Sequence, residues 1–170
     1  MTSQADAVQK LLDAHEIQQV LLKYPIAIDS REYDLLDPLF WPGAKVLLAG
    51  MPDLDAAAYK EICRTNLGGF DATQHTVGPA AIEIAGDKAN TRCYFIAQHS
   101  KNALRPNPHL IIGGWYDDEF ERRGGVWRIA VRRGTAAWFD GNPEVLGYPV
   151  PAGGLEWNPG RNCPAWLKPR

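Results

Sequence analysis

Cysteine is scarce in this 170-residue chain, and the three that occur, Cys63, Cys93 and Cys163, cannot all pair with one another. None of them forms a C-x-x-C motif, which disfavours a disulfide scaffold or a zinc finger and fits a reducing compartment. Metal-ligand spacings such as H-x-H or H-E-x-x-H do not occur either. We therefore expect a protein that holds no metal.

Long apolar runs and an excess of basic residues are also missing. The longest apolar run, around Val46 to Met51, is far too short to cross a membrane, and the polar start Met1 to Lys10 does not look like a signal peptide. With 18 Lys+Arg against 20 Asp+Glu, the net charge is -2, whereas nucleic-acid-binding domains are usually basic. Apolar residues make up 45% of the chain, which is typical of a globular domain. We expect a cytoplasmic domain that binds neither nucleic acid nor membrane.

The first third of the sequence predicts helices. Ser3 and Asp6 have capping-box spacing, and apolar residues then recur at helical spacing as far as Tyr24. Pro25 is expected to kink this helix or to begin a new turn. Further elements expected before residue 70 are a short helix over Tyr33–Phe40, a strand around Lys45–Ala49, and a helix from an Asp53 N-cap to about Asn66.

From residue 72 the pattern changes to long strands separated by glycine, asparagine and proline turns. Helices followed by consecutive antiparallel strands favour an α+β fold, in which a curved sheet packs on the N-terminal helices around a cone-shaped pocket. The expected strands are Thr73–Ala85, Ala89–Ser100, Leu110–Glu121 and Val126–Asp140.

The last thirty residues differ from the rest, so we divide the chain into a domain over 1–140 and a C-terminal arm over 141–170. The arm holds six of the 13 prolines and five glycines, a density that excludes long regular elements. It also carries apolar side chains, which favour packing on its own domain or on a neighbouring subunit; a floppy tail is the alternative. These apolar residues are Val145, Leu146, Tyr148, Trp157 and Trp166.

Asp29 and His75 are the first candidates for chemistry. Asp29 directly follows the apolar run Ile26–Ile28, so its carboxylate should lie near the core and need a partner. If that partner is His75, the carboxylate would fix the imidazole tautomer and make the other ring nitrogen a base. The alternatives are structural: Asp29 could pair with Arg31 or cap the next turn, and His75 could be an ordinary strand histidine.

His99 and Tyr24 are weaker candidates. Alternation along the strand places His99 at the end of an apolar stripe, either in a pocket wall or at the surface. Tyr24 precedes Asp29 by five residues, about 140° apart on a straight helix, and could equally be a core aromatic.

The last strand ends in two adjacent arginines. Simple alternation places Arg133, rather than Arg132, on the apolar side together with Trp127 and Ile129. The alternative is a cross-strand ion pair with Glu119 or Glu121.

The chain resembles the SnoaL-like branch of the nuclear-transport-factor-2-like (NTF2-like) superfamily over about residues 8 to 140. Within it, the chain looks most like the group of scytalone dehydratase, bile-acid 7α-dehydratase and hexachlorocyclohexane dehydrochlorinase. The segments that carry the resemblance are Ile17–Asp29 with its Tyr24 and Asp29, Thr73–Gly78, Gly113–Phe120 and Trp127–Arg132.

The resemblance implies roles for individual residues. Asp29 and His75 match the general-base dyad, and Tyr24 matches a helix tyrosine of the bile-acid enzyme. Arg132, five residues after the last-strand tryptophan, matches a site arginine, so the resemblance chooses Arg132 where alternation chooses Arg133. His99 falls where scytalone dehydratase has its second histidine. Ile28 and the pair Leu47–Leu48 stand where that enzyme carries tyrosines, which argues against scytalone as the substrate.

We therefore expect a cofactor-independent, dehydratase-like lyase acting on a small apolar cyclic molecule. An isomerase with the same dyad and a non-catalytic module that binds hydrophobic ligands are the alternatives. The resemblance also implies a homo-oligomer, a dimer or trimer, that associates through the outer face of the sheet. Trp115 and Trp127 are expected to be exposed on that face.

Overall fold

The computed structural model describes residues 3–48, 51–147 and 164–168. The chain opens with the long helix α1 (Gln4–Asp29), whose N-cap is Ser3 in the expected capping box with Asp6. Pro25 does not end this helix: α1 continues through it to Asp29. Within the described ranges, no helix is long and apolar enough to span a membrane.

The segment between α1 and the main sheet departs from expectation at three places. The predicted helix over Tyr33–Phe40 is a single 3-10 turn (Tyr33–Leu36), because strand β1 (Phe40–Leu48) already begins at Phe40. Asp55, rather than Asp53, caps α2 (Ala56–Ile62), and a π-helical turn (Cys63–Leu67) follows it. The two-residue strand β2 (Leu54–Asp55) precedes α2 and pairs with β1.

Within the described residues, seven strands form one mixed sheet in the order β2-β1-β7-β6-β5-β3, with β4 also paired to β5. The expected strand over Thr73–Ala85 is two strands, because Gly78 and Pro79 interrupt the ladder. Among these seven strands, the pairing of β1 with β7 is parallel and the other pairings are antiparallel. The remaining bounds are β3 (Ala72–Val77), β4 (Ala81–Ala85), β5 (Lys88–Ser100), β6 (His109–Arg123) and β7 (Val126–Gly141).

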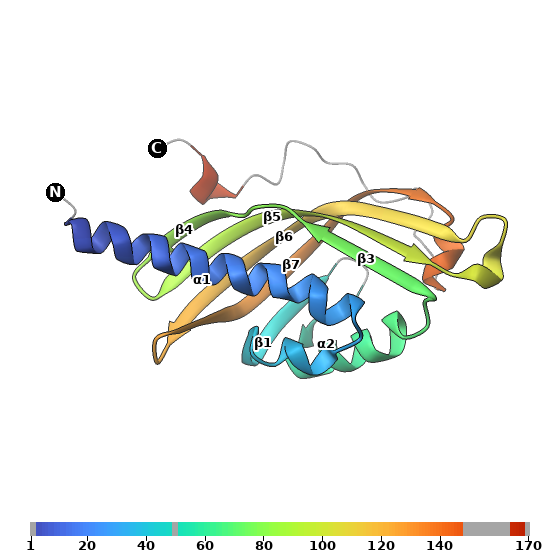
Figure 1. Ribbon diagram of the computed structural model, residues 1–170, viewed down its shortest axis with the longest axis horizontal. Helices are drawn as coiled ribbons and strands as arrows, with labels where there is room; N and C mark the ends of the chain where they lie inside the picture. The colour runs from blue at the N-terminus through green and yellow to red at the C-terminus, as the bar shows by residue number, and fades with distance from the viewer. Residues whose placement is uncertain (1–2, 49–50, 148–163, 169–170) are drawn as a thin grey trace.

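The core lies between the helices and one face of this curved sheet, as the order of elements predicts (Figure 1). From α1, the core takes a stripe that includes Ile17, Leu21 and Tyr24. Trp127 also belongs to the core: it is 2% exposed, and its Nε1 donates to Asp13 3.0 Å away, so the expectation of an exposed Trp127 is wrong. Trp115 is half-buried on the other face, against Tyr94.

The C-terminal region is described only in part. Gly141 still belongs to β7, and Val145 is buried in a 3-10 turn (Pro143–Leu146). A second 3-10 turn (Ala165–Leu167) includes Trp166. Tyr148 and Trp157 lie outside the described residues, so the packing of the whole arm stays a prediction.

Candidate active site

Asp29 and His75 meet where the end of α1 reaches β3. Nδ1 of His75 lies 2.7 Å from Oδ1 of Asp29, and the backbone N–H of His75 donates to Oδ2 over 2.6 Å. The Thr73 hydroxyl donates to Oδ1 over 2.9 Å. Because both oxygens of the carboxylate accept from β3, this strand holds Asp29 in one orientation. The side chains of His75 and Asp29 are 8% and 22% exposed, so the pair is largely shielded from water.

The electrostatics of Asp29 favour the carboxylate. Burial alone would raise its pKa, but hydrogen bonds from the His75 ring, the His75 backbone and Thr73 outweigh burial and hold the pKa below its ordinary value. An ionised Asp29 can only accept, so the Nδ1 of a neutral His75 carries the proton. Nε2 is then left with a lone pair and can accept a proton from another molecule.

His99 lies beside His75. The two rings meet edge to face with centroids 5.3 Å apart, and Phe70 covers His99 with centroids 5.0 Å apart. In the β3–β5 ladder, His99 stands opposite Thr73, and His75 stands opposite Ala97. Burial, followed by the charge of His75, lowers the pKa of His99 to about 4, so this imidazole is neutral at physiological pH. Among the hydrogen bonds of the described residues, its Nδ1 has no partner.

Tyr24 and Arg132 lie in a second group, which we call the arginine cluster: Arg132, Asp118, Tyr24, Tyr116 and Tyr59. Arg132 is fully buried and binds Asp118 bidentately, through Nε over 2.9 Å and Nη2 over 2.7 Å. Its guanidinium carbon lies 4.1 Å from the ring centroid of Tyr24 and 4.4 Å from that of Tyr116. The hydroxyls of Tyr24 and Tyr59 share a hydrogen bond.

The choice of Arg133 by alternation is wrong, and a β-bulge is the reason. In the β6–β7 ladder, Phe120 pairs with Ile129 and Glu119 pairs with Val131, so Ala130 has no opposite residue. The extra residue reverses the alternation, which turns Arg132 into the core and Arg133 outward. Arg133 forms an exposed ion pair with Glu119 at 2.7 Å, the alternative that the sequence left open.

The five expected site residues therefore fall into two groups. Asp29, His75 and His99, with Thr73, form what we call the dyad cluster, whereas Tyr24 and Arg132 belong to the arginine cluster. Sequence reasoning missed Thr73, although its position two residues before His75 places it on the same side of β3. It also missed Asp118 and Tyr59, for which only the fold supplies the partners. Within the described ranges, no group of three or more His, Cys, Asp or Glu side chains is arranged to hold a metal.

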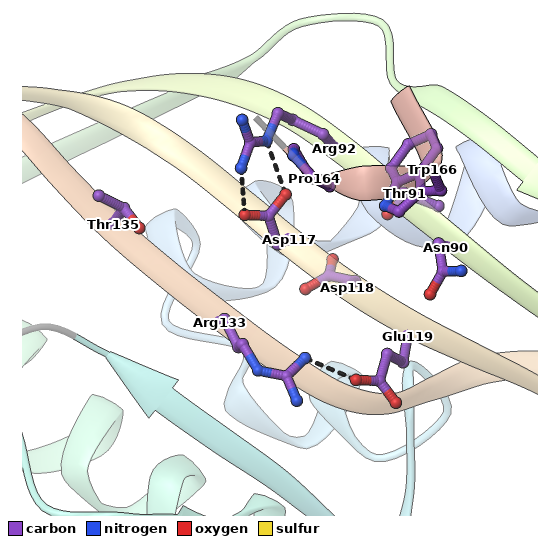
Figure 2. Close-up of a pocket in the computed structure, with 10 residues that line it drawn as sticks. All are labelled: Asn90, Thr91, Arg92, Asp117, Asp118, Glu119, Arg133, Thr135, Pro164 and Trp166. Carbon is purple, nitrogen blue, oxygen red and sulfur yellow. Dashed lines mark hydrogen bonds and ion pairs between the residues drawn. The ribbon is translucent and has the colours of Figure 1, made fainter. Parts of the chain in front are cut away.

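A pocket of about 530 Å³ lies on the outer side of the sheet, where Pro164 and Trp166 approach β5 and β6 (Figure 2). Arg92 pairs with Asp117 in this pocket, with Nε 2.7 Å from Oδ1, and stacks on Trp115. Figure 2 shows this pair and the Arg133–Glu119 pair along its wall. Both arginines already hold carboxylate partners, and the lining residues do not include the dyad cluster.

Comparison with known proteins places the chain in a family. Residues 9–133 match the model of the SnoaL-like domain, so the chain belongs to the SnoaL-like family. An uncharacterised protein of Mycobacterium tuberculosis, Rv2910c, is 33% identical over 131 residues, which are 75% of this chain and 86% of that protein. The gamma-hexachlorocyclohexane dehydrochlorinase of Sphingobium indicum is 23% identical over 142 residues, 78% of this chain and 85% of that enzyme.

Solved structures show the same fold. The crystal structure of LinA matches with a TM-score of 0.73 and 21% identity, covering 81% of this chain and 94% of that one. The structure of a scytalone dehydratase candidate from Novosphingobium aromaticivorans matches with a TM-score of 0.70 and 22% identity. The match covers 79% of this chain and 90% of that one. The structure of an NTF2-like superfamily protein of Salmonella enterica matches with a TM-score of 0.65 and 17% identity. The match covers 72% of this chain and 89% of that one. The predicted NTF2-like α+β fold is confirmed.

Proposed function

We propose that this protein is a cofactor-independent lyase of the dehydratase type, in which His75 removes a proton from a small apolar cyclic substrate. The observation that carries the proposal is the 2.7 Å contact between Asp29 and His75, shielded between α1 and β3. The lowered pKa of Asp29 supports it, because an ionised carboxylate stabilises the imidazolium that forms when the base takes up a proton. The distant kinship to a dehydrochlorinase, an eliminating enzyme by its name, supports the reaction class.

The proposed step is an elimination. Nε2 of His75 takes the proton, the electrons of the broken C–H bond form a carbon–carbon double bond, and hydroxide or halide leaves from the neighbouring carbon. We propose that neutral His99 accepts or donates a hydrogen bond to the substrate, which its ring contact with His75 supports. Tyr24 and Arg132 are proposed to stabilise the leaving anion. Arg132 suits this role because, among the hydrogen bonds of the described residues, its buried Nη1 has no partner.

The test is the substitution His75→Ala. Purified protein is first assayed against a panel of cyclic alcohols, ketones and halides that includes gamma-hexachlorocyclohexane, with loss of water or chloride as the readout. For the substrate that reacts fastest, the variant should lose about 10²- to 10⁴-fold in kcat, while the Kd measured by tryptophan fluorescence stays within about threefold. The exposed His15→Ala variant is the matched control.

Other outcomes separate the alternatives. Isomerised product without loss of a group would identify an isomerase with the same dyad. Saturable binding without turnover of any panel member would identify a binding module and overturn the proposal. For the lyase, kcat/KM should fall as the pH drops, since a protonated imidazole cannot accept a second proton; a flat profile from about pH 5 to 8 contradicts a histidine base.

We also propose that the chain forms a homo-oligomer, a dimer or trimer, through the outer sheet face. Tyr94, Ile96 and Trp138 are 64%, 51% and 38% exposed there, which supports an apolar contact surface. Sedimentation equilibrium of the wild type and of Ile96→Lys should show an assembly that the substitution weakens. A wild-type monomer would contradict this proposal.

A further inference from the structure

The dyad is held by a directed chain of hydrogen bonds that begins at Arg31. Nη1 of Arg31 lies 2.8 Å from the Thr73 hydroxyl oxygen, which lies 2.9 Å from Oδ1 of Asp29. A guanidinium can only donate and an ionised carboxylate can only accept, so both roles of the Thr73 hydroxyl are settled. Thr73 accepts from Arg31, and its single proton therefore points at Asp29.

Arg31 is itself fixed on three sides. It is the one non-glycine residue of the described ranges with positive φ (65°), which turns the chain sharply after the end of α1. Its guanidinium also donates, over 3.3 Å in each case, to the carbonyls of Ile28 and Phe70. One side chain thus ties the last turn of α1 to the loop before β3 and to β3 itself.

This arrangement differs from the ion pair between Asp29 and Arg31 that the sequence offered as an alternative. Among the ion pairs of the described residues, Asp29 has only His75 as partner. Arg31 therefore acts on the carboxylate through Thr73 and not by direct contact. Oδ1 of Asp29 thus remains able to accept a hydrogen bond from Nδ1 of His75. A direct guanidinium contact would instead compete with the imidazole for the same oxygens.

We propose that Arg31 and Thr73 are positioning residues that orient Asp29, so that His75 keeps its proton on Nδ1 and presents Nε2 as the base. The part of this inference that rests on the proposed function is the use of Nε2 as a catalytic base. The central claim of the inference, that Arg31 and Thr73 control the tautomer of His75, can be measured without any substrate. Failure of the panel assay and failure of this inference are therefore separate results.

The experiment uses nitrogen-15 NMR of the full-length chain labelled on histidine, at a pH where the imidazole is neutral. In the wild type, His75 should be almost wholly in the Nδ1–H form. Thr73→Val removes the hydroxyl at nearly constant volume and should raise the ratio of the Nε2–H to the Nδ1–H form about tenfold. Thr73→Ser, which keeps the hydroxyl, should restore the wild-type ratio. Thr76→Val, the same change on the exposed side of β3, is the matched control.

Arg31→Met completes the test, because it removes the donors but leaves Thr73 in place. It should raise the ratio of the Nε2–H to the Nδ1–H form. The double variant with Thr73→Val should have no higher ratio than Thr73→Val alone, because both substitutions act through one hydroxyl. If Thr73→Val does not fold, Arg31→Met and Thr73→Ser still supply the measurement. An unchanged tautomer ratio in folded Thr73→Val or Arg31→Met protein overturns the inference, even if the melting temperature falls. The inference is also overturned if the free-energy effects of the two substitutions on the tautomer ratio simply add in the double variant.

Discussion

Asp29, at the end of α1, and Asp118, on β6, are carboxylates whose partners make them chemically different. Asp29 accepts hydrogen bonds from a histidine, a hydroxyl and a backbone N–H. Asp118 accepts from Nε and Nη2 of Arg132, whose guanidinium lies against the rings of Tyr24 and Tyr116. A histidine can gain and lose a proton near neutral pH, whereas an arginine keeps its charge. The dyad cluster is therefore suited to proton transfer, and the arginine cluster provides a fixed positive charge.

Burial separates the two pairs further. Asp29 keeps partial exposure, and its hydrogen bonds hold its pKa below the ordinary value. Burial raises the pKa of Asp118, and the bound guanidinium opposes that rise. Asp118 and Arg132 thus depend on each other for burial, because either charge alone would be costly in the core. Loss of Asp118 should therefore affect stability, whereas loss of the dyad should affect chemistry.

The largest expected effect sharpens this contrast. Asp118→Ala leaves the buried guanidinium of Arg132 without its partner and should lower the free energy of unfolding by about 3–5 kcal/mol, measured by urea denaturation. The neighbouring Glu119→Ala removes an exposed ion pair with Arg133 and should cost less than about 1 kcal/mol. Equal losses in the two variants would show that burial does not distinguish these pairs.

The next effect concerns the dyad cluster and pH. The pKa of His99 is lowered to about 4, so the unfolded chain takes up this proton first as the pH falls. Stability should therefore be full above about pH 6.5, the ordinary histidine pKa, and fall by about 3 kcal/mol towards pH 4. The contribution of Asp29, whose pKa is lowered, is lost only at still lower pH, below its ordinary pKa of 3.8. Urea denaturation at a series of pH values measures the slope.

His99→Gln should flatten the curve between about pH 6.5 and 4, because glutamine does not titrate. The exposed His15→Gln is the control and should leave the slope unchanged. A wild-type stability that stays constant across this window would mean that His99 is not desolvated in the folded protein.

The sequence predicted the contact of Asp29 with His75 but not the surroundings of that pair. Asp29 follows an apolar helical run, and His75 alternates with Thr73 on a strand, so local pattern and family resemblance pointed to the same residues. The hydrogen bonds of Arg31 to Thr73 and Phe70 could not be predicted from the sequence, because they depend on a positive φ at Arg31 and on a loop carbonyl at Phe70. Such contacts follow from how the end of α1 meets β3, and no periodicity encodes them.

The arginine cluster shows the same limit in another form. Alternation assigned the wrong arginine because it assumes an unbroken ladder, and the bulge at Ala130 leaves no clear mark in the sequence. The capping box of α1 was predictable because it is local, whereas the parallel pairing of β1 with β7 joins segments far apart in the chain. Pro25 was expected to disturb α1, yet it is buried within the helix, where tertiary packing outweighs the lost hydrogen bond.

The smallest expected effect tests whether the arginine cluster depends on its hydrogen bonds or only on its packing. Tyr59→Phe removes one hydrogen-bond partner of the buried Tyr24 hydroxyl, which also bonds Tyr116, and should cost about 1–2 kcal/mol of unfolding free energy. Tyr33→Phe is the matched change: among the hydrogen bonds of the described residues, the buried Tyr33 hydroxyl has no partner. Removing it should change stability by less than about 0.5 kcal/mol or raise it, since an unpaired buried hydroxyl is unfavourable. If both variants lose the same amount, ring packing rather than the hydroxyl pair holds Tyr24 against Arg132, and the contrast with the hydrogen-bonded dyad cluster becomes sharper still.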